Sequence, residues 1–177
     1  LVLASYDFSG FEHIVDVAGG AGKLLAGILG SAPKLRGTLF DMPSVIEQAK
    51  ADKILDAYSS RSELVAGSFF EAVPQGADAY IMKHIIHDWD AEHATKILRH
   101  CRSAMRPNGK LLVADRVLDP PNAPDPKKFF DIAMMLIPGG RERTEQVWHE
   151  LYAASGFRVS RIIPTPGPLS IIEGLPV

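Results

Sequence analysis

The residues best suited to acid–base chemistry stand together in one run, Lys83-His84-Ile85-Ile86-His87-Asp88-Trp89-Asp90. This run follows a short apolar stretch, residues 79–83, that is predicted to be a strand. In an open α/β sheet, catalytic groups gather where strands end and face the ligand crevice. A histidine at such a place can act as a general base near neutral pH. The run therefore predicts proton abstraction at this edge of the sheet.

Metal binding is the alternative for the same run, because His84, His87, Asp88 and Asp90 all carry ligand atoms. They fall at a bend between a strand and a helix, which offers no fixed face on which ligands converge. We therefore predict no metal ion here. His84 is expected to point away from His87 and to be structural.

A second candidate site is the glycine-rich turn Asp16-Val17-Ala18-Gly19-Gly20-Ala21-Gly22, which joins a β-branched run to an apolar run with helical periodicity. Glycine permits left-handed backbone angles and lets a ligand approach the main chain closely. Free N–H groups at the start of the following helix then face that ligand. The pattern predicts a strand, a tight loop and a helix, which form the first unit of an open α/β sheet.

Three ligand classes use such a loop. A phosphate loop requires Gly-Lys-Ser/Thr, whereas Leu24 follows Gly22-Lys23 here. A dinucleotide fingerprint requires a small third residue, and Leu25 stands at that position. The acidic-x-Gly-x-Gly-x-Gly loop of S-adenosylmethionine (SAM) methyltransferases fits Asp16-x-Ala18-x-Gly20-x-Gly22, with Ala18 in place of the first glycine. A glycine turn that only lets the helix pack on the strand stays open as the alternative.

Further candidates follow the second and third predicted strands. Asp41 stands where an acid reaches the ribose hydroxyls of a nucleoside that lies across the strand ends; its alternative role is to cap the helix that begins at Pro43. Ser68 and Phe69 follow the third strand and would flank an adenine. Phe69 is equally well explained as a core residue.

Composition narrows the function classes. The chain has 177 residues, of which 46% are hydrophobic and 23% charged, enough for one domain with a sizeable core. A formal net charge of −2 argues against a general nucleic-acid binder. Cys101 is the single cysteine, which excludes an internal disulfide and favours a reducing, cytoplasmic setting. We expect no membrane span, no signal peptide at residues 1–5, and a chain that is the C-terminal piece of a longer protein.

Strands alternate with helices along most of the chain, which predicts a parallel sheet. Towards the end, a short Pro/Gly-rich connection between two strands suits a hairpin instead. The fold class predicted is α/β, with a seven-stranded, mostly parallel sheet, an antiparallel closing strand and helices on both faces. The expected strands are residues 13–17, 35–40, 63–66, 79–83, 110–115, 158–163 and 169–173; the expected helices are 21–31, 43–55, 90–105, 127–137 and 144–155.

Several of these segments resemble one known family. The run that contains His87-Asp88-Trp89 is the most diagnostic, and Leu39-Phe40-Asp41-Met42-Pro43, Gly67-Ser68-Phe69-Phe70, Ala114-Asp115-Arg116 and Gly139-Gly140-Arg141-Glu142-Arg143-Thr144 accompany it. Together they resemble the SAM-dependent O-methyltransferases of the plant caffeate, flavonoid and hydroxyindole type. The resemblance spans nearly the whole chain, and it implies a Rossmann-like class I methyltransferase domain over residues 1–177.

The resemblance implies roles for individual residues. His87 would be the base that takes the proton from a hydroxyl of a small aromatic acceptor, and Asp115 and Glu142 would be the two acids that orient it. The cofactor would be SAM, and S-adenosyl-L-homocysteine the product. Asp88 and Met134 are assigned to the acceptor side, although Asp88 has the alternative role of supporting its loop. The residues assigned to the cofactor are Asp16, Ala18, Gly19, Gly20, Gly22, Asp41, Met42, Ser68, Phe69 and Lys83.

Two departures from the family pattern matter. Ala18 replaces a glycine beside the cofactor, which costs about 1 kcal/mol if the position requires a positive φ. The family's N-terminal helical domain, which dimerises and helps to wall the acceptor pocket, is absent from this sequence, so we expect an open acceptor side and a homodimeric parent protein. Three alternatives stay open: an N- or C-methyltransferase, a catalytically silent SAM-binding or dimerisation module, and a nicotinamide oxidoreductase, against which Leu25 argues.

Overall fold

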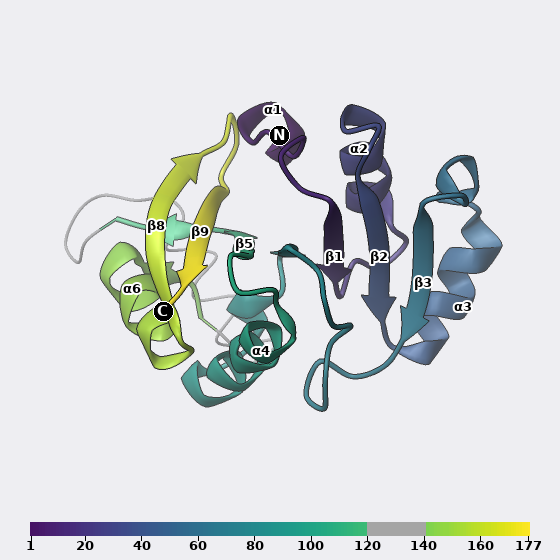
Figure 1. Ribbon diagram of the computed structural model, residues 1–177. Coiled ribbons are helices and arrows are strands. Elements are labelled where there is room, and N and C mark those ends of the chain that lie inside the picture. Colours follow the sequence, from purple (N-terminus) through teal and green to yellow (C-terminus); the bar gives the residue numbers. More distant parts are fainter. Residues whose placement is uncertain (120–140) are drawn as a thin grey trace.

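A computed structural model describes residues 1–119 and 141–177 of the chain. Its strands alternate with helices as expected, and seven of them form one sheet (Figure 1). These strands are β1 (His13–Val17), β2 (Arg36–Asp41), β3 (Ser62–Ala66), β4 (Ala79–Lys83), β5 (Lys110–Asp115), β8 (Phe157–Pro164) and β9 (Ser170–Pro176).

The sheet has the order β3-β2-β1-β4-β5-β9-β8. Strands β1 to β5 pair in parallel, whereas β9 pairs antiparallel with both β5 and β8. The predicted sheet, with its closing antiparallel hairpin, is confirmed. Since β1, β4 and β5 are parallel neighbours, the loops that follow them emerge at one edge of the sheet.

Helices cover both faces of the sheet (Figure 1). The first face carries α1 (Val2–Ser5), α2 (Lys23–Ser31) and α3 (Pro43–Asp52), and the second carries α4 (Ala91–Ala104) and α6 (Glu145–Ala154). Two short 3₁₀ turns, η1 (Asp56–Tyr58) and η2 (Ile86–Asp88), and a two-stranded ladder of β6 (Val117–Leu118) with β7 (Arg143–Thr144) complete the described elements.

The two faces have separate hydrophobic cores because side chains of a strand alternate between them. In β4, Tyr80 and Met82 pack in the core under α4 and α6, while Ala79 and Ile81 pack in the core under α2 and α3. All four are fully buried. A strand that is buried on both faces has a continuous run of apolar residues, and this run predicted β4 from the sequence.

Helix α4 shows how local sequence sets an element that flanks the candidate base. The side chain of Asp90 accepts a hydrogen bond of 2.9 Å from the main-chain N–H of His93 and caps the helix. Ala94, Ile97 and Leu98 then bury one face against the sheet. Trp89 alone separates this capping residue from the turn η2 (Ile86–Asp88), which contains His87.

Some boundaries differ from expectation. Helix α3 ends at Asp52, not near residue 55, because Lys53 adopts a left-handed φ of 57°. The first residues include the one-turn helix α1, which is not among the expected helices. The predicted helix at 127–137 lies outside the described residues. Within the described ranges, no helix is both long and apolar enough to span a bilayer.

Candidate active site

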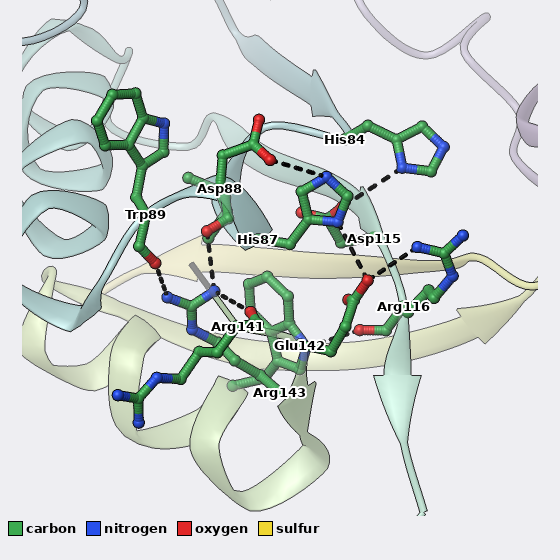
Figure 2. A network of polar contacts seen from close by, with 11 residues as sticks. His84, His87, Asp88, Trp89, Asp115, Arg116, Arg141, Glu142 and Arg143 are labelled. Carbon is green, nitrogen blue, oxygen red and sulfur yellow. Dashed lines mark hydrogen bonds and ion pairs between the residues drawn. The ribbon is translucent and has the colours of Figure 1, made fainter. Parts of the chain in front are cut away.

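His87 lies in the turn η2, directly after β4, and its ring is surrounded by acids (Figure 2). The ring nitrogen Nδ1 is 3.2 Å from Oε1 of Glu142 and 3.5 Å from Oδ1 of Asp115. The other nitrogen, Nε2, is 3.4 Å from Oδ1 of Asp88. The side chain of His87 is only 8% exposed. The structure therefore brings together the base and the two acids that the resemblance implied.

The acids around His87 make it a stronger base. Burial by itself lowers the pKa of an imidazole, because the charged form loses water. The hydrogen bond with Glu142 and the negative charges of Asp115, Glu142 and Asp88 outweigh burial, so the pKa of His87 lies above its ordinary value. A carboxylate on Nδ1 also fixes the tautomer that leaves Nε2 free to accept a proton.

Glu142 is kept ionised by an arginine that sequence reasoning did not assign. Nη1 of Arg116 donates to Oε1 of Glu142 at 2.8 Å, and the Glu142 side chain is fully buried. Burial raises the pKa of Glu142, but the hydrogen bonds from His87 and Arg116 lower it further, so the net shift is downward. Glu142 therefore lies in the interior of the protein, with its charge facing His87 and Arg116.

Asp115 ends β5 in a different environment. It is completely buried, and neither carboxylate oxygen makes a well-formed hydrogen bond within residues 1–119 and 141–177. Burial raises the pKa of Asp115 to about 7, with the charge of His87 opposing this and that of Glu142 adding to it. Two neighbouring carboxyl groups thus have pKa values that their surroundings shift in opposite directions.

His84 was expected to point elsewhere, and this expectation is wrong. Its Nδ1 is 3.9 Å from Oδ1 of Asp115, and its ring centre is 5.3 Å from that of His87. The cause is a left-handed backbone, with φ of 59°, which turns the side chain back toward the site. Spacing arguments assume regular φ and ψ and cannot see such a residue.

Electrostatics keep His84 neutral. Burial, together with the positive charges of Lys83, His87 and Arg116, lowers the pKa of His84 to about 4. One ligand atom each of His84, His87 and Asp115 lies within 4.8 Å of the others. Since this spacing suits a cation as well as a proton network, the expectation of no metal stays a prediction.

The glycine loop encloses a separate pocket of about 250 Å³, lined by Asp16, Ala18, Gly19, Ala21, Lys23, Leu24 and Lys83. Ala18, Gly20 and Gly22 all have positive φ, of 56°, 58° and 79°. Ala18 therefore sits in a conformation that costs a residue with a Cβ atom about 1 kcal/mol. A Cβ atom on Gly19 would fall 2.5 Å from Cδ1 of Leu39 and 2.6 Å from Cγ of Asp16, so this glycine is required for space.

Asp16 lies beneath the loop and is 1% exposed. Its Oδ2 is buried and has no hydrogen-bond partner within the described part of the chain. Burial raises the pKa of Asp16 to about 7; the amide of Leu25 and the charge of Lys83 oppose this, and Asp41 adds to it. A buried acceptor beside an open pocket fits a ligand with a positively charged or hydrogen-bond-donating group.

Asp41 binds the glycine loop. Its Oδ2 accepts a bond of 2.9 Å from the N–H of Gly20, and its Oδ1 accepts one of 2.7 Å from the N–H of Met42. The alternative that Asp41 caps α3 is wrong, because the N-cap residue of that helix is Met42, whose side chain makes no capping bond, and Asp41 accepts from the N–H groups of Gly20 and Met42, which precede the first turn of the helix. A carboxylate has acceptor sites to spare for a ribose hydroxyl, so that role stays a prediction.

The remaining assigned residues are less close to this pocket. Ser68 lines a second pocket of about 240 Å³ with Phe40 and Gly67. Phe69 packs edge-on against Phe70 and Trp89, as a core residue does. Met42 is 57% exposed. Met134 lies outside the described residues.

Comparison with known proteins now decides the family. A model of the O-methyltransferase domain matches residues 1–158. The chain belongs to this O-methyltransferase family. The phenazine O-methyltransferase of Lysobacter antibioticus is 42% identical to this O-methyltransferase domain over 177 residues, which are 99% of the chain and 52% of that protein.

Two solved structures extend the comparison. An O-methyltransferase from neocarzinostatin biosynthesis, in complex with S-adenosyl-L-homocysteine and 1,4-dihydroxy-2-naphthoic acid, has a TM-score of 0.89 and 34% identity. A dimethyltransferase of 8-amino-8-demethyl-D-riboflavin from Streptomyces davawensis has a TM-score of 0.87 and 32% identity. Each match covers 99% of the O-methyltransferase domain and 52% of the other chain. The predicted class I methyltransferase fold is confirmed, and the chain spans about half the length of the curated relatives it matches.

Proposed function

We propose that the protein transfers the methyl group of SAM to a hydroxyl group of a small aromatic molecule, with His87 as general base. The observation that carries this proposal is the buried contact of 3.2 Å between Nδ1 of His87 and Oε1 of Glu142. It gives a base of raised pKa at the strand edge from which the glycine loop also emerges. The family supports the choice of reaction.

The glycine loop fits the methionine part of SAM. The site offers backbone N–H groups at a helix start, a pocket floor without a side chain at Gly19, and Oδ2 of Asp16, which has no hydrogen-bond partner among residues 1–119 and 141–177. These groups suit an amino-acid group. Asp41 would hold the ribose, and Lys83 lines the same pocket. SAM, when bound, supplies a methyl group on a positively charged sulfonium. The residues present therefore fit the cofactor.

Residues of this chain would remove the proton of the acceptor hydroxyl. The acceptor hydroxyl loses its proton to Nε2 of His87, and the imidazolium that forms keeps its Nδ1–H on Glu142. Arg116 holds Glu142 in the charged form that stabilises this imidazolium. Asp88 covers Nε2 and is 41% exposed, so it can turn outward into water as the acceptor approaches. Positioning and proton removal are the two contributions expected of the protein.

The acceptor class follows from the relatives. They include enzymes named for phenazine and for aminohydroxybenzoate, and one crystallised with a dihydroxynaphthoic acid. We therefore propose that the acceptor of this protein is also a hydroxylated aromatic molecule. The test is transfer of labelled methyl from SAM to a panel of phenols by the intact protein that carries this sequence. His87→Ala is expected to abolish transfer while calorimetry shows unchanged SAM binding; near-normal transfer by the variant would reject the base role.

N-methylation is the second candidate, because the riboflavin-type dimethyltransferase is 32% identical and acts on an amine. A neutral amine attacks with its own lone pair and does not need a base before attack. Paired phenol and aniline acceptors therefore separate the two: activity on anilines that survives His87→Ala favours N-methylation. SAM binding without turnover on either class would instead favour a silent binding module.

We further propose a homodimer in the cytoplasm. The resemblance to a family with an N-terminal dimerisation domain supports the first part, and the buried thiol of Cys101, which requires no oxidising compartment, supports the second. Light scattering of the intact protein tests the dimer. A monomer at micromolar concentration would contradict it.

A further inference from the structure

Arg143 carries a positive charge in the interior of the protein. It is 2% exposed. Burial lowers the pKa of its guanidinium to about 10, with Asp115 and Glu142 opposing this, so the group stays protonated at neutral pH. A buried charge destabilises a fold unless hydrogen bonds replace the lost water. The groups that accept hydrogen bonds from Arg143 therefore indicate the role of its charge.

The guanidinium donates to main-chain carbonyls on both sides of the base (Figure 2). Nη1 donates to the carbonyl oxygen of Ile86 at 2.8 Å and to that of Arg141 at 3.2 Å. Nη2 donates to the carbonyl oxygen of Trp89 at 2.7 Å. The carbon Cζ of the group lies 5.6 Å from the ring centre of Trp148, which packs against it. The planar fork thus spans the turn that contains His87.

A main-chain hydrogen bond also joins residues 141–143 to the turn of His87. The main-chain N–H of Arg141 donates to the carbonyl oxygen of His87 at 2.9 Å. Residues 141–143 therefore hold the main chain at Ile86, His87 and Trp89. Glu142, between the two arginines, places Oε1 at 3.2 Å from Nδ1 of His87. One short segment sets both the backbone of the base and the position of its carboxylate partner.

We propose that Arg143 is a positioning residue, whose guanidinium holds the turn Ile86–Asp88 in the register in which His87 meets Glu142. It acts through His87, and the inference rests on the proposed function for the role of that base. A lysine at this position would keep the charge but would lose the planar fork that serves Ile86 and Trp89 together. The charge alone is therefore not sufficient.

The test compares Arg143→Lys with Arg158→Lys in the intact protein. Arg158 is the matched control, because its side chain is exposed and it lies in β8, outside the contacts that hold the turn of His87. For Arg143→Lys, kcat is expected to fall about 100-fold, the usual effect of moving a catalytic group by 1 Å. The affinity for SAM, measured by calorimetry, is expected to stay within about twofold, because the glycine loop is a separate site. Arg158→Lys is expected to leave both unchanged.

The pH dependence separates positioning from general damage. The groups that face His87 are Glu142, Asp115, Asp88 and the neutral His84. When the turn moves away from Glu142, the pKa of His87 is expected to fall, both in the pH profile of kcat and in an NMR titration of the ring. The NMR titration requires no turnover, so it still tests Arg143 if the protein transfers no methyl group.

Three results would overturn the inference. They are a wild-type kcat and pH profile for Arg143→Lys, an equal loss of SAM affinity and kcat, or an unshifted titration of His87 in a folded variant. If Arg143→Lys does not fold, Arg143→Gln replaces it as a neutral side chain that still donates. Hydrogen exchange of the wild-type protein adds a measurement without mutation: the Arg141 amide is expected to exchange only on global unfolding, and rapid exchange would contradict a fixed turn.

Discussion

Glu142→Gln isolates the charge that raises the pKa of His87. The replacement keeps the shape of the side chain and an oxygen that accepts from Arg116, but removes the negative charge. In the native protein this charge faces His87 at 3.2 Å and Arg116 at 2.8 Å, and Glu142 has no exposed side-chain surface. Solvent therefore screens neither contact strongly.

The magnitude follows from these two contacts. A hydrogen bond to a charged group contributes about 1.5–3 kcal/mol. Since Arg116 keeps a neutral acceptor in the variant, only part of the Arg116 bond is lost, whereas most of the His87 bond is lost. The free energy of unfolding is therefore expected to fall by about 3 kcal/mol near pH 6. Only the His87 contact acts on the imidazolium-forming step, and its loss of about 1.5–3 kcal/mol would slow methyl transfer by about one to two orders of magnitude.

The pH dependence has a definite sign. The pKa of His87 is raised above 6.5, so its share of the stabilisation is complete below that value and is lost as the pH rises through the folded pKa. The pKa of Glu142 is lowered below 4.5, so its share is complete above that value and is lost on acidification. The difference in unfolding free energy between the two proteins is thus largest between about pH 5 and pH 6.5, and at high pH only the Arg116 share remains.

Urea unfolding of the 177-residue chain from pH 5 to pH 9 measures this difference, and an NMR titration follows the His87 ring. Glu71→Gln, at an exposed position, is the control and is expected to show no pH-dependent difference. A Glu142→Gln difference that is the same at every pH, or an unchanged pKa of His87, would refute the electrostatic reasoning.

Three further predictions concern backbone and charge. Ala18→Gly removes the strain of a left-handed backbone at a residue with a Cβ atom, about 1 kcal/mol, but increases the conformational entropy of the unfolded chain by a comparable amount. The melting temperature is therefore expected to stay the same or rise slightly. A clear fall would show that Ala18 is not strained. Gly19→Ala is expected to lower the free energy of unfolding by about 1–3 kcal/mol, because its Cβ atom would collide with Leu39 and Asp16. Gly20→Ala is expected to cost less, because its Cβ atom meets open space and only the φ of 58° is unfavourable. Chemical denaturation measures both values, and the reverse order would contradict this explanation. Glu173 lies in β9; burial raises its pKa, but hydrogen bonds lower it to about 2, and their donors are Arg161, Ser160, Tyr6 and Lys110. Glu173→Gln is therefore expected to cost about 2–3 kcal/mol at pH 7. Its unfolding curves should converge with those of the wild type as the pH falls from about 4.5 toward 2.

Much of the fold was predictable because local patterns carry it. The apolar runs at residues 79–83 and 110–115 are buried on both faces, and the face of α4 repeats with helical spacing. Once such strands alternate with helices, parallel pairing brings the loops after β1, β4 and β5 to one edge. The sequence was therefore enough to predict that the glycine loop and the His87 run lie at the same edge of the sheet.

The ladder of β6 with β7 was not predictable in the same way. Each strand has two residues, too few to show any periodicity. Yet this ladder places Arg116 beside Glu142 and Arg143 behind the turn of His87. The only signal in the sequence was that an arginine follows each of the two predicted acids, Asp115 and Glu142.

By itself, the sequence determined which residue types stand at the strand ends, and so a base, two acids and a glycine loop. Only the tertiary structure decided what each group does there. Asp115 and Glu142 are both carboxylic acids. Burial raises the pKa of Asp115, which has no well-formed hydrogen bond among the described residues, whereas hydrogen bonds from His87 and Arg116 lower the pKa of Glu142. His84 entered the site through a single left-handed φ. Burial, ion pairing and irregular dihedrals depend on contacts between distant segments, which no local pattern encodes.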